Sequence, residues 1–352
     1  MTTAHRLLNR MVGKELPGAQ YLVTNADAPQ LEFSVGMRDA ASGQPMSPET
    51  LLMAYSMTKA ITAVALVQLV DAGKVGIDEA LSAFFPDHPY GREVTLRMLL
   101  AQTAGIPNPM PLDWFEVEGK SFDREEKLRN LLSKYPRLKH RAGHAYSYSN
   151  LSYWLLEKVV EAASKADFAD YVRANVFGRL GILGGSATFT LPPAATLATG
   201  HARRYSLQTL FVRWLSPRDY WVEPSGSFCR TARVTPHGRG YGGLFTNAGA
   251  LGAVLRDLLR EEPKLMSRSA KALMFSQQRA NGRPIDMTLG WVIGRCQGTT
   301  YFGKQGGGLG FNGNLRIYPE RGVATVFLAN GTELSPGPID RRSDVLDAAF
   351  LK

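Results

Sequence analysis

The sequence contains little cysteine and no long apolar run. Only Cys229 and Cys296 occur among its 352 residues, far apart and without neighbours at metal-ligand spacing. We interpret both as free thiols in a reducing compartment, although two cysteines also allow one disulfide. The most apolar stretch, residues 51–70, is interrupted by Ser56 and Lys59. It therefore lacks the roughly 20 uninterrupted apolar residues that a membrane-spanning helix needs, and no membrane partner is expected.

The N-terminal segment also lacks the features of a secretory signal. Arg6, Arg10 and Lys14 are not followed by an apolar core, which in a signal peptide is about 7–15 residues long. We therefore expect a cytoplasmic protein, unless a leader has been removed.

Several familiar catalytic and binding motifs are missing. No Gly-x-Ser-x-Gly occurs, which excludes the nucleophile elbow of the α/β-hydrolases. Residues 238–243 and 308–313 both spell Gly-x-Gly-x-x-Gly, but neither stands between a strand and a helix as a dinucleotide site requires. His140 and His144 have helical i, i+4 spacing, but Gly143 between them argues against a metal-binding helix. No metal or cofactor is expected.

The excess of positive charge does not indicate nucleic-acid binding. The net charge is +10, but the basic residues are scattered. The densest run is residues 203–218, where four arginines alternate with Tyr205, Phe211 and Trp214. Because no nucleic-acid-binding motif accompanies this run, we interpret it as a solvated basic face.

The order of predicted elements indicates an α+β fold. Strands are expected at both ends of the chain, with helices and loops between them. The simplest packing joins the N-terminal hairpin and the C-terminal strands in one antiparallel sheet. We expect an α/β lobe from residues 1–60 with 236–352, and a mainly helical lobe from residues 61–235. The predicted strands are residues 21–24, 31–36, 288–295, 314–318 and 324–329. The predicted helices are residues 2–15, 56–70, 95–102, 150–163, 168–177, 247–261 and 340–351, and residues 106–145 are predicted to be irregular.

Ser56-Met57-Thr58-Lys59 is the first candidate for chemistry. It opens a long apolar run without Gly or Pro, so we expect it at a helix N-terminus. Residues three apart on a helix are neighbours, roughly 5–6 Å between Cβ atoms, so the Lys59 amine is able to reach the Ser56 hydroxyl. A serine becomes a good nucleophile only beside a base. The alternative is a capping serine followed by a solvated lysine.

Two further motifs suit a serine–lysine hydrolase. Tyr148-Ser149-Asn150 offers a phenol for proton transfer and an amide that holds a substrate carbonyl or the lysine. Its alternative is a buried tyrosine beside an asparagine cap. Residues 303–308, Gly-Lys-Gln-Gly-Gly-Gly, allow close backbone approach and supply Lys304. We expect Lys304 to lower the pKa of Lys59 by repulsion and the pKa of Tyr148 by attraction. The alternative interpretation of residues 303–308 is a flexible glycine turn with a surface lysine.

Together, in this order, the three motifs resemble the serine β-lactamase and penicillin-binding-protein superfamily, most closely the class C β-lactamases and the family VIII carboxylesterases. Four further segments fit the same pattern: residues 95–106, 241–244, 289–291 and 326–330. The resemblance is weakest across residues 107–140 and 184–235.

The resemblance implies a role for each motif residue. Ser56 would be the acylated nucleophile and Lys59 its base. Tyr148 would pass a proton to the leaving group and activate the deacylating water. Asn150 would orient Lys59 and the substrate. Lys304 opens the third motif, in which Gly306 and Gly307 follow, and the backbone N–H groups of Ser56 and Gly307 would form the oxyanion hole.

One departure from the family pattern bears on the substrate. The third motif of such β-lactamases is usually Lys-Thr-Gly, whereas this sequence has Lys304-Gln305-Gly306. We therefore expect a carboxylesterase acting on small esters. The alternatives are a class C-like β-lactamase, a D-amino-acid peptidase or amidase, an acyltransferase, and an inactive binding protein on the same scaffold. The expected partner is a small ester or amide substrate, and oligomeric state is left open. Four aromatic residues are candidates for the pocket lining: Trp114, Phe115, Tyr301 and Phe311.

Overall fold

The computed structural model describes residues 3–13, 15–109, 114–222, 224, 226–332 and 338–351. Thr2 and Lys14, which belong to the predicted opening helix, lie outside these ranges. None of the helices in the described ranges combines the length and apolar character needed to cross a bilayer. The described residues also contain no group of three or more His, Cys, Asp or Glu side chains placed to hold a metal ion.

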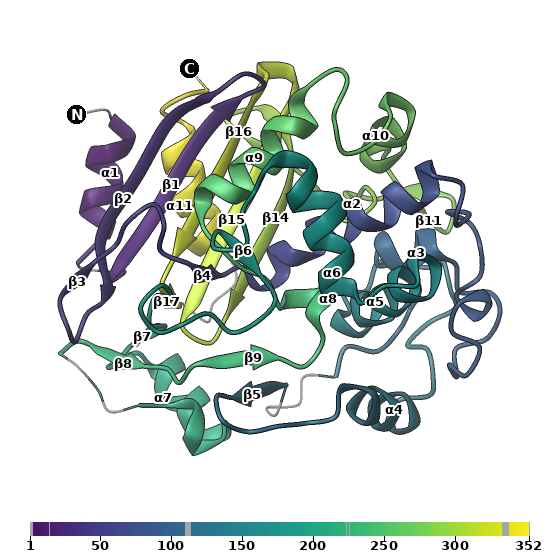
Figure 1. Ribbon diagram of the computed structural model, residues 1–352, viewed down its shortest axis with the longest axis horizontal. Coiled ribbons are helices and arrows are strands. Elements are labelled where there is room, and N and C mark those ends of the chain that lie inside the picture. The colour runs from purple at the N-terminus through teal and green to yellow at the C-terminus, as the bar shows by residue number, and fades with distance from the viewer. Residues whose placement is uncertain are drawn as a thin grey trace.

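A seven-stranded antiparallel sheet joins the two ends of the chain (Figure 1). Its strand order is β13-β14-β15-β16-β1-β2-β3. The N-terminal hairpin meets the C-terminal strands where β1 pairs with β16, with Tyr21 opposite Phe327. The α+β prediction and the single antiparallel sheet are confirmed. The strands are β1 (Gly18–Asn25), β2 (Pro29–Asp39), β3 (Gln44–Pro45), β13 (Val292–Cys296), β14 (Thr299–Gly308), β15 (Phe311–Tyr318) and β16 (Val323–Ala329).

Helices cover both faces of the sheet. Side chains alternate along each strand, so neighbouring residues of one strand contact different helices. Tyr21 and Val23 of β1 belong to the apolar cluster formed with α1 and α11. Leu22 points to the other face, where α9 packs so closely that a Cβ on Gly252 would lie 2.6 Å from Leu22 Cδ2. The helices are α1 (Thr3–Met11), α2 (Thr58–Asp71), α3 (Leu96–Leu100), α4 (Arg124–Lys134), α5 (Asn150–Ser164), α6 (Phe168–Val172), α7 (Leu207–Leu215), α8 (Arg239–Gly242), α9 (Ala248–Leu259), α10 (Arg268–Phe275) and α11 (Pro338–Asp347).

Small sheets connect the long elements. The short strands are β4 (Leu52–Met53), β5 (Phe115–Val117), β6 (Ala187–Thr188), β7 (His201–Arg203), β8 (Phe228–Arg230), β9 (Val234–Pro236), β10 (Phe245–Thr246), β11 (Arg279–Ala280), β12 (Arg283–Pro284) and β17 (Gly331–Thr332). The antiparallel pairing of β4 with β10 holds the chain just before the Ser56 turn.

Helix α2 is the centre of the helical part. Twelve of its fourteen residues are buried, because the helix is apolar on all sides and is surrounded by other elements. The helix ends where Gly73 takes a left-handed φ of 66°, a conformation that favours glycine.

Two predictions about the chain's middle and end are wrong. Residues 106–145 are not simply irregular, because they contain β5 and α4. The alternative interpretation of residues 303–308 as a flexible glycine turn does not hold, because these residues lie inside β14. The preceding strand, predicted at 288–295, is β13 and begins only at Val292.

Candidate active site

Ser56 projects from a tight turn. Tyr55–Met57 form a short 3₁₀ helix and α2 begins at Thr58, so Ser56 lies just ahead of the helix that the sequence predicts around it. Tyr55 has a left-handed φ of 44°, which bulky side chains rarely adopt. The Tyr55 hydroxyl donates to the Leu309 carbonyl at 2.8 Å. This bond ties the strained turn to the sheet and leaves Ser56 half-buried.

Lys59 is fully buried and contacts Ser56. Its Nζ lies 3.0 Å from Ser56 Oγ, 2.7 Å from Asn150 Oδ1 and 2.7 Å from the Tyr241 carbonyl oxygen. A neutral amine has two N–H groups and one lone pair, and the Asn150 and Tyr241 oxygens can only accept. Donation to both of these oxygens directs the lone pair of Lys59 at the Ser56 hydroxyl. The arrangement suits Lys59 to remove the serine proton, and the alternative of a solvated lysine is wrong.

Tyr148 completes a hydrogen-bonded cluster with these residues. Its hydroxyl lies 2.7 Å from Ser56 Oγ and donates to Asn150 Oδ1 at 3.1 Å. Lys59 Nζ lies 5.0 Å from the centre of the Tyr148 ring. Asn150 therefore accepts from both Lys59 and Tyr148 and connects the two side chains.

The loop that carries Tyr148 is held by two residues that the sequence does not single out. Gln102 accepts from the Ser149 amide and donates to the Ser149 carbonyl at 3.1 Å. Asn108 Oδ1 accepts from the Asn150 amide at 2.9 Å. Ser149, rather than Asn150, caps α5 by accepting from the Ser152 amide. The Asn150 side chain is thereby left available for the site.

Lys304 enters the same site from β14. It is 4% exposed, and its Nζ lies 5.8 Å from the centre of the Tyr148 ring and 5.9 Å from that of Tyr153. Among the described residues, no hydrogen-bond acceptor or carboxylate pairs with its ammonium group. The site thus contains two buried amines around one phenol.

Gly306 and Gly307 bring the edge of β14 against the Ser56 turn. The pairing of β14 with β13 ends at Gly303, which lies opposite Val292. Residues 304–308 of β14 therefore extend past the end of β13. A Cβ on Gly306 would lie 2.1 Å from the Ala54 carbonyl oxygen, so only glycine permits this approach. Gly307 is exposed. Its backbone is therefore accessible, and its role as an oxyanion-hole donor stays a prediction.

Comparison with known proteins identifies the family. The family model described as Beta-lactamase matches residues 5–350. The chain belongs to the Beta-lactamase family. Penicillin-binding protein 4* of Bacillus subtilis (strain 168) is 26% identical over 323 residues, covering 85% of this chain and 65% of that protein. Protein flp of Staphylococcus aureus (strain COL) is 27% identical over 162 residues, covering 45% of this chain and 32% of flp. The match thus covers about a third of flp and just under two thirds of penicillin-binding protein 4*.

Solved structures show the same fold over the whole chain. D-amino acid amidase from Ochrobactrum anthropi SV3 superposes with a TM-score of 0.84 at 18% identity, covering 99% of this chain and 98% of the amidase. The penicillin binding protein from Bacillus halodurans superposes with a TM-score of 0.76 at 23% identity, again covering 99% and 98% of the two chains.

In this member of the Beta-lactamase family, burial dominates the electrostatics of the site. Burial, reinforced by the charge of Lys304, holds the pKa of Lys59 well below its usual range. Burial also lowers the pKa of Lys304 to about 8. The prediction that Lys304 lowers the pKa of Lys59 is confirmed in direction. Both effects favour the neutral form of Lys59, whose lone pair is then available to accept a proton.

The expected shift of Tyr148 is wrong in sign. Burial raises the pKa of the Tyr148 phenol, and this effect outweighs the hydrogen bond shared with Ser56. The resting phenol therefore keeps its proton and is available as an acid rather than as a base.

These shifts predict a bell-shaped pH profile of kcat/KM. Activity rises with pH as Lys59 loses its proton, well below the pH at which an ordinary lysine titrates. It falls again around pH 8 as Lys304 loses the charge that stabilises an ionised Tyr148. Lys304→Met should lower the maximum and remove the falling limb. Measurement of p-nitrophenyl butyrate hydrolysis, corrected for spontaneous hydrolysis at each pH, tests this, and an unchanged falling limb in Lys304→Met contradicts it.

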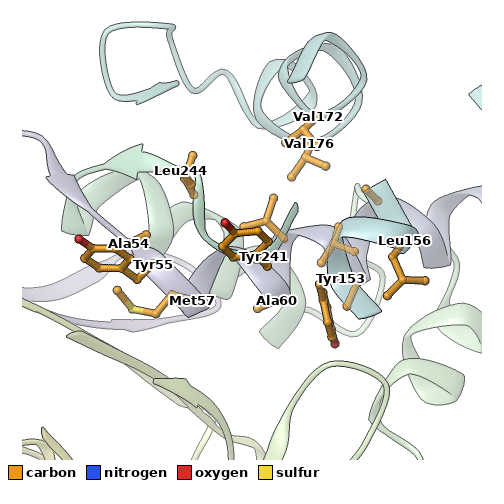
Figure 2. Packing of buried hydrophobic residues seen from close by; sticks show 14 of the residues in the cluster. Ala54, Tyr55, Met57, Ala60, Tyr153, Leu156, Val172, Val176, Tyr241 and Leu244 are labelled. Atoms are coloured by element: carbon orange, nitrogen blue, oxygen red, sulfur yellow. The ribbon is translucent and has the colours of Figure 1, made fainter. Parts of the chain in front are cut away.

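Tyr241 and Glu157 are site residues that sequence reasoning missed. The Tyr241 carbonyl fixes Lys59, and the Glu157 carboxylate accepts from the adjacent Gly240 amide at 2.8 Å. Burial raises the pKa of Glu157 to about 7. Figure 2 shows Tyr55, Tyr241 and Tyr153 among the buried side chains around the start of α2. A backbone carbonyl carries no sequence signal, and the burial that distinguishes Glu157 from other glutamates is visible only in the structure.

The four aromatic candidates have different surroundings. Trp114 packs on Tyr241 with ring centres 5.1 Å apart. Phe115 and Tyr55 pack edge to face, with ring centres 5.9 Å apart. Both therefore adjoin residues of the site. Phe311 is 5% exposed and belongs to the core. The guanidinium carbon of Arg316 lies 4.3 Å from the centre of the Tyr301 ring. Tyr301 is three residues from Lys304 on β14, so the two side chains point to opposite faces of the sheet.

Proposed function

We propose that this protein is a serine hydrolase that cleaves small carboxylic esters through an acyl-enzyme on Ser56. The observation that carries the proposal is the set of Lys59 contacts, in which two acceptors take the N–H groups of the neutral amine and leave its lone pair for the serine. The membership of the Beta-lactamase family supports the same reaction class.

In the acylation step, neutral Lys59 takes the proton of Ser56 and Oγ attacks the ester carbonyl carbon. The backbone N–H groups of Ser56 and Gly307 hold the resulting oxyanion. As the tetrahedral intermediate collapses, the phenol of Tyr148 gives its proton to the departing alkoxide. The acyl-enzyme then contains a Lys59 ammonium and a Tyr148 phenolate, which stabilise each other, with Lys304 adding a second positive charge.

Deacylation reverses both proton transfers. The Tyr148 phenolate takes a proton from water as the water oxygen attacks the acyl carbon. The tetrahedral intermediate collapses, and Ser56 Oγ leaves with the proton held by Lys59. The carboxylic acid is released, and both side chains return to their neutral resting forms. The low pKa of Lys59 and the high pKa of Tyr148 make that neutral pair the ground state.

The third motif favours esters over β-lactams. Gln305 occupies the position where β-lactamases of the class that this chain resembles usually have the threonine that holds the lactam carboxylate. Amides, including D-amino-acid amides, are the second candidate substrates. The close superposition on D-amino acid amidase favours them, although that likeness establishes the fold alone.

A parallel substrate panel distinguishes these activities. We expect kcat/KM to be highest for p-nitrophenyl acetate or butyrate, and lower for D-phenylalanine amide, a D-Ala-D-Ala peptide and nitrocefin. Alcohol acceptors added to the ester assay report any acyl transfer. A higher value for D-phenylalanine amide establishes the amidase instead, and a higher value for nitrocefin establishes the β-lactamase.

A further inference from the structure

The α7 region carries most of the large apolar side chains that the described part of the protein exposes. Seven of the twelve such residues lie between positions 205 and 222. Scattered exposed apolar residues are ordinary, but a contiguous group marks an interaction site. We call this group the α7 surface, and its apolar members are Tyr205, Leu207, Leu210, Phe211, Trp214, Leu215 and Val222.

The apolar residues of α7 share one side of the helix. Leu207, Leu210, Phe211 and Trp214 follow i, i+3, i+4, i+7 spacing. Leu207 is 84% exposed and Trp214 is 79% exposed. The helix is anchored from its other side, where Thr209 is buried. The apolar side therefore faces outward, at the periphery of the molecule (Figure 1).

The inner side of α7 is held by Arg213. Its guanidinium lies 5.6 Å from the centre of the Trp221 ring, and its Nη1 donates to Cys229 Sγ at 3.2 Å. Trp221 in turn donates to Ser216 Oγ at 2.7 Å, just after the helix ends. These contacts fix which side of the helix is presented to solvent.

The charge along the chain segment that contains α7 has one sign up to residue 218. Residues 200–218 contain four arginines and no Asp or Glu. Arg203 and Arg218 are exposed, and Arg204 lies 5.3 Å from the centre of the Tyr205 ring. No ion pair between described residues involves these three arginines. The next acidic residue, Asp219, is paired with Lys120.

We propose that the α7 surface docks on an anionic phospholipid membrane, with the helix lying in the plane of the interface. Trp214, Tyr205 and Phe211 suit the boundary between headgroups and acyl chains, and guanidinium groups bind phosphate. A second copy of the chain is a poorer occupant, because a two-fold contact sets identical arginines against each other. The run 203–218 is thus more than a solvated basic face.

Vesicle sedimentation with the full chain tests this proposal. The probes are vesicles of phosphatidylcholine alone and of phosphatidylcholine with phosphatidylglycerol in equal parts. We expect binding only to the anionic vesicles, with a blue shift of tryptophan fluorescence that Trp214→Phe diminishes. Replacing Arg203 or Arg204 by glutamine should weaken binding about fivefold each. Leu207→Ser should weaken binding about tenfold.

Leu183→Ser is the matched control, because Leu183 is 77% exposed but lies outside the α7 surface. Three results would overturn the proposal. The two leucine variants lose binding equally, the protein binds neutral and anionic vesicles equally, or it binds neither kind of vesicle. A dimer in light scattering that Leu207→Ser dissociates, without vesicle binding, assigns the surface to a second copy instead. Because binding is measured without turnover, these results do not depend on the proposed hydrolase activity.

Discussion

Replacing Ser56 by alanine is expected to lower kcat for p-nitrophenyl butyrate by about 10⁶-fold, the scale seen when the nucleophile of a serine hydrolase is removed. The loss follows because, within the described part of the chain, Ser56 Oγ is the one hydroxyl that hydrogen-bonds Lys59 Nζ. Stopped-flow and long-term colorimetric assays on the same preparation cover the required range. The fold should persist, because Ser56 is only half-buried and the change removes a single oxygen.

Ser42→Ala is the control for this experiment. Ser42 is exposed and donates to Asp39 at 3.1 Å, away from the Ser56 turn. The control should retain full activity. If Ser56→Ala keeps more than a small fraction of wild-type turnover when purified in the same way, Ser56 is not the nucleophile and the acyl-enzyme route is wrong.

Replacing Lys59 by methionine is expected to cost nearly as much as removing the serine. Methionine fills a similar volume but supplies no lone pair, so Ser56 keeps its proton. Nucleophile and base act as one unit, so the double variant Ser56→Ala, Lys59→Met should be little worse than either single variant. The measurement is kcat/KM for p-nitrophenyl butyrate in all three variants.

Thermal unfolding separates this loss from a folding defect. Lys59→Met leaves the Tyr241 carbonyl without its lysine donor, so a modest fall in Tm is expected. Lys74→Met, at an exposed position just beyond the end of α2, should change neither Tm nor activity. Additive losses in the double variant would show that Lys59 acts independently of Ser56.

The parts of the site that depend on local spacing could be predicted from the sequence. The contact between Ser56 and Lys59 follows from residues three apart, and it survives although α2 begins two residues later than expected. The approach of Tyr148 and Lys304 to Ser56 joins segments about a hundred or more residues apart. No local pattern specifies such contacts, and only the family resemblance indicated them.

The errors have definite physical causes. Glycines weaken any strand pattern, so no strand is predicted across residues 303–308, whereas β14 needs glycine there because Gly306 packs against the Ala54 carbonyl. Helix α4 was missed because only Leu128 and Leu132 of its residues are buried, which leaves a weak periodic signal. The pKa of Tyr148 was misjudged because charges are visible in a sequence and burial is not.

Covalent labelling tests the central claim most directly. The protein is incubated with a fluorophosphonate, its intact mass is measured, and the modified residue is located by peptide mapping. The proposed mechanism predicts one adduct per chain, on Ser56, formed much more slowly in Lys59→Met. An adduct on another residue, or an unmodified Ser56 in a protein that still hydrolyses p-nitrophenyl butyrate, would contradict it.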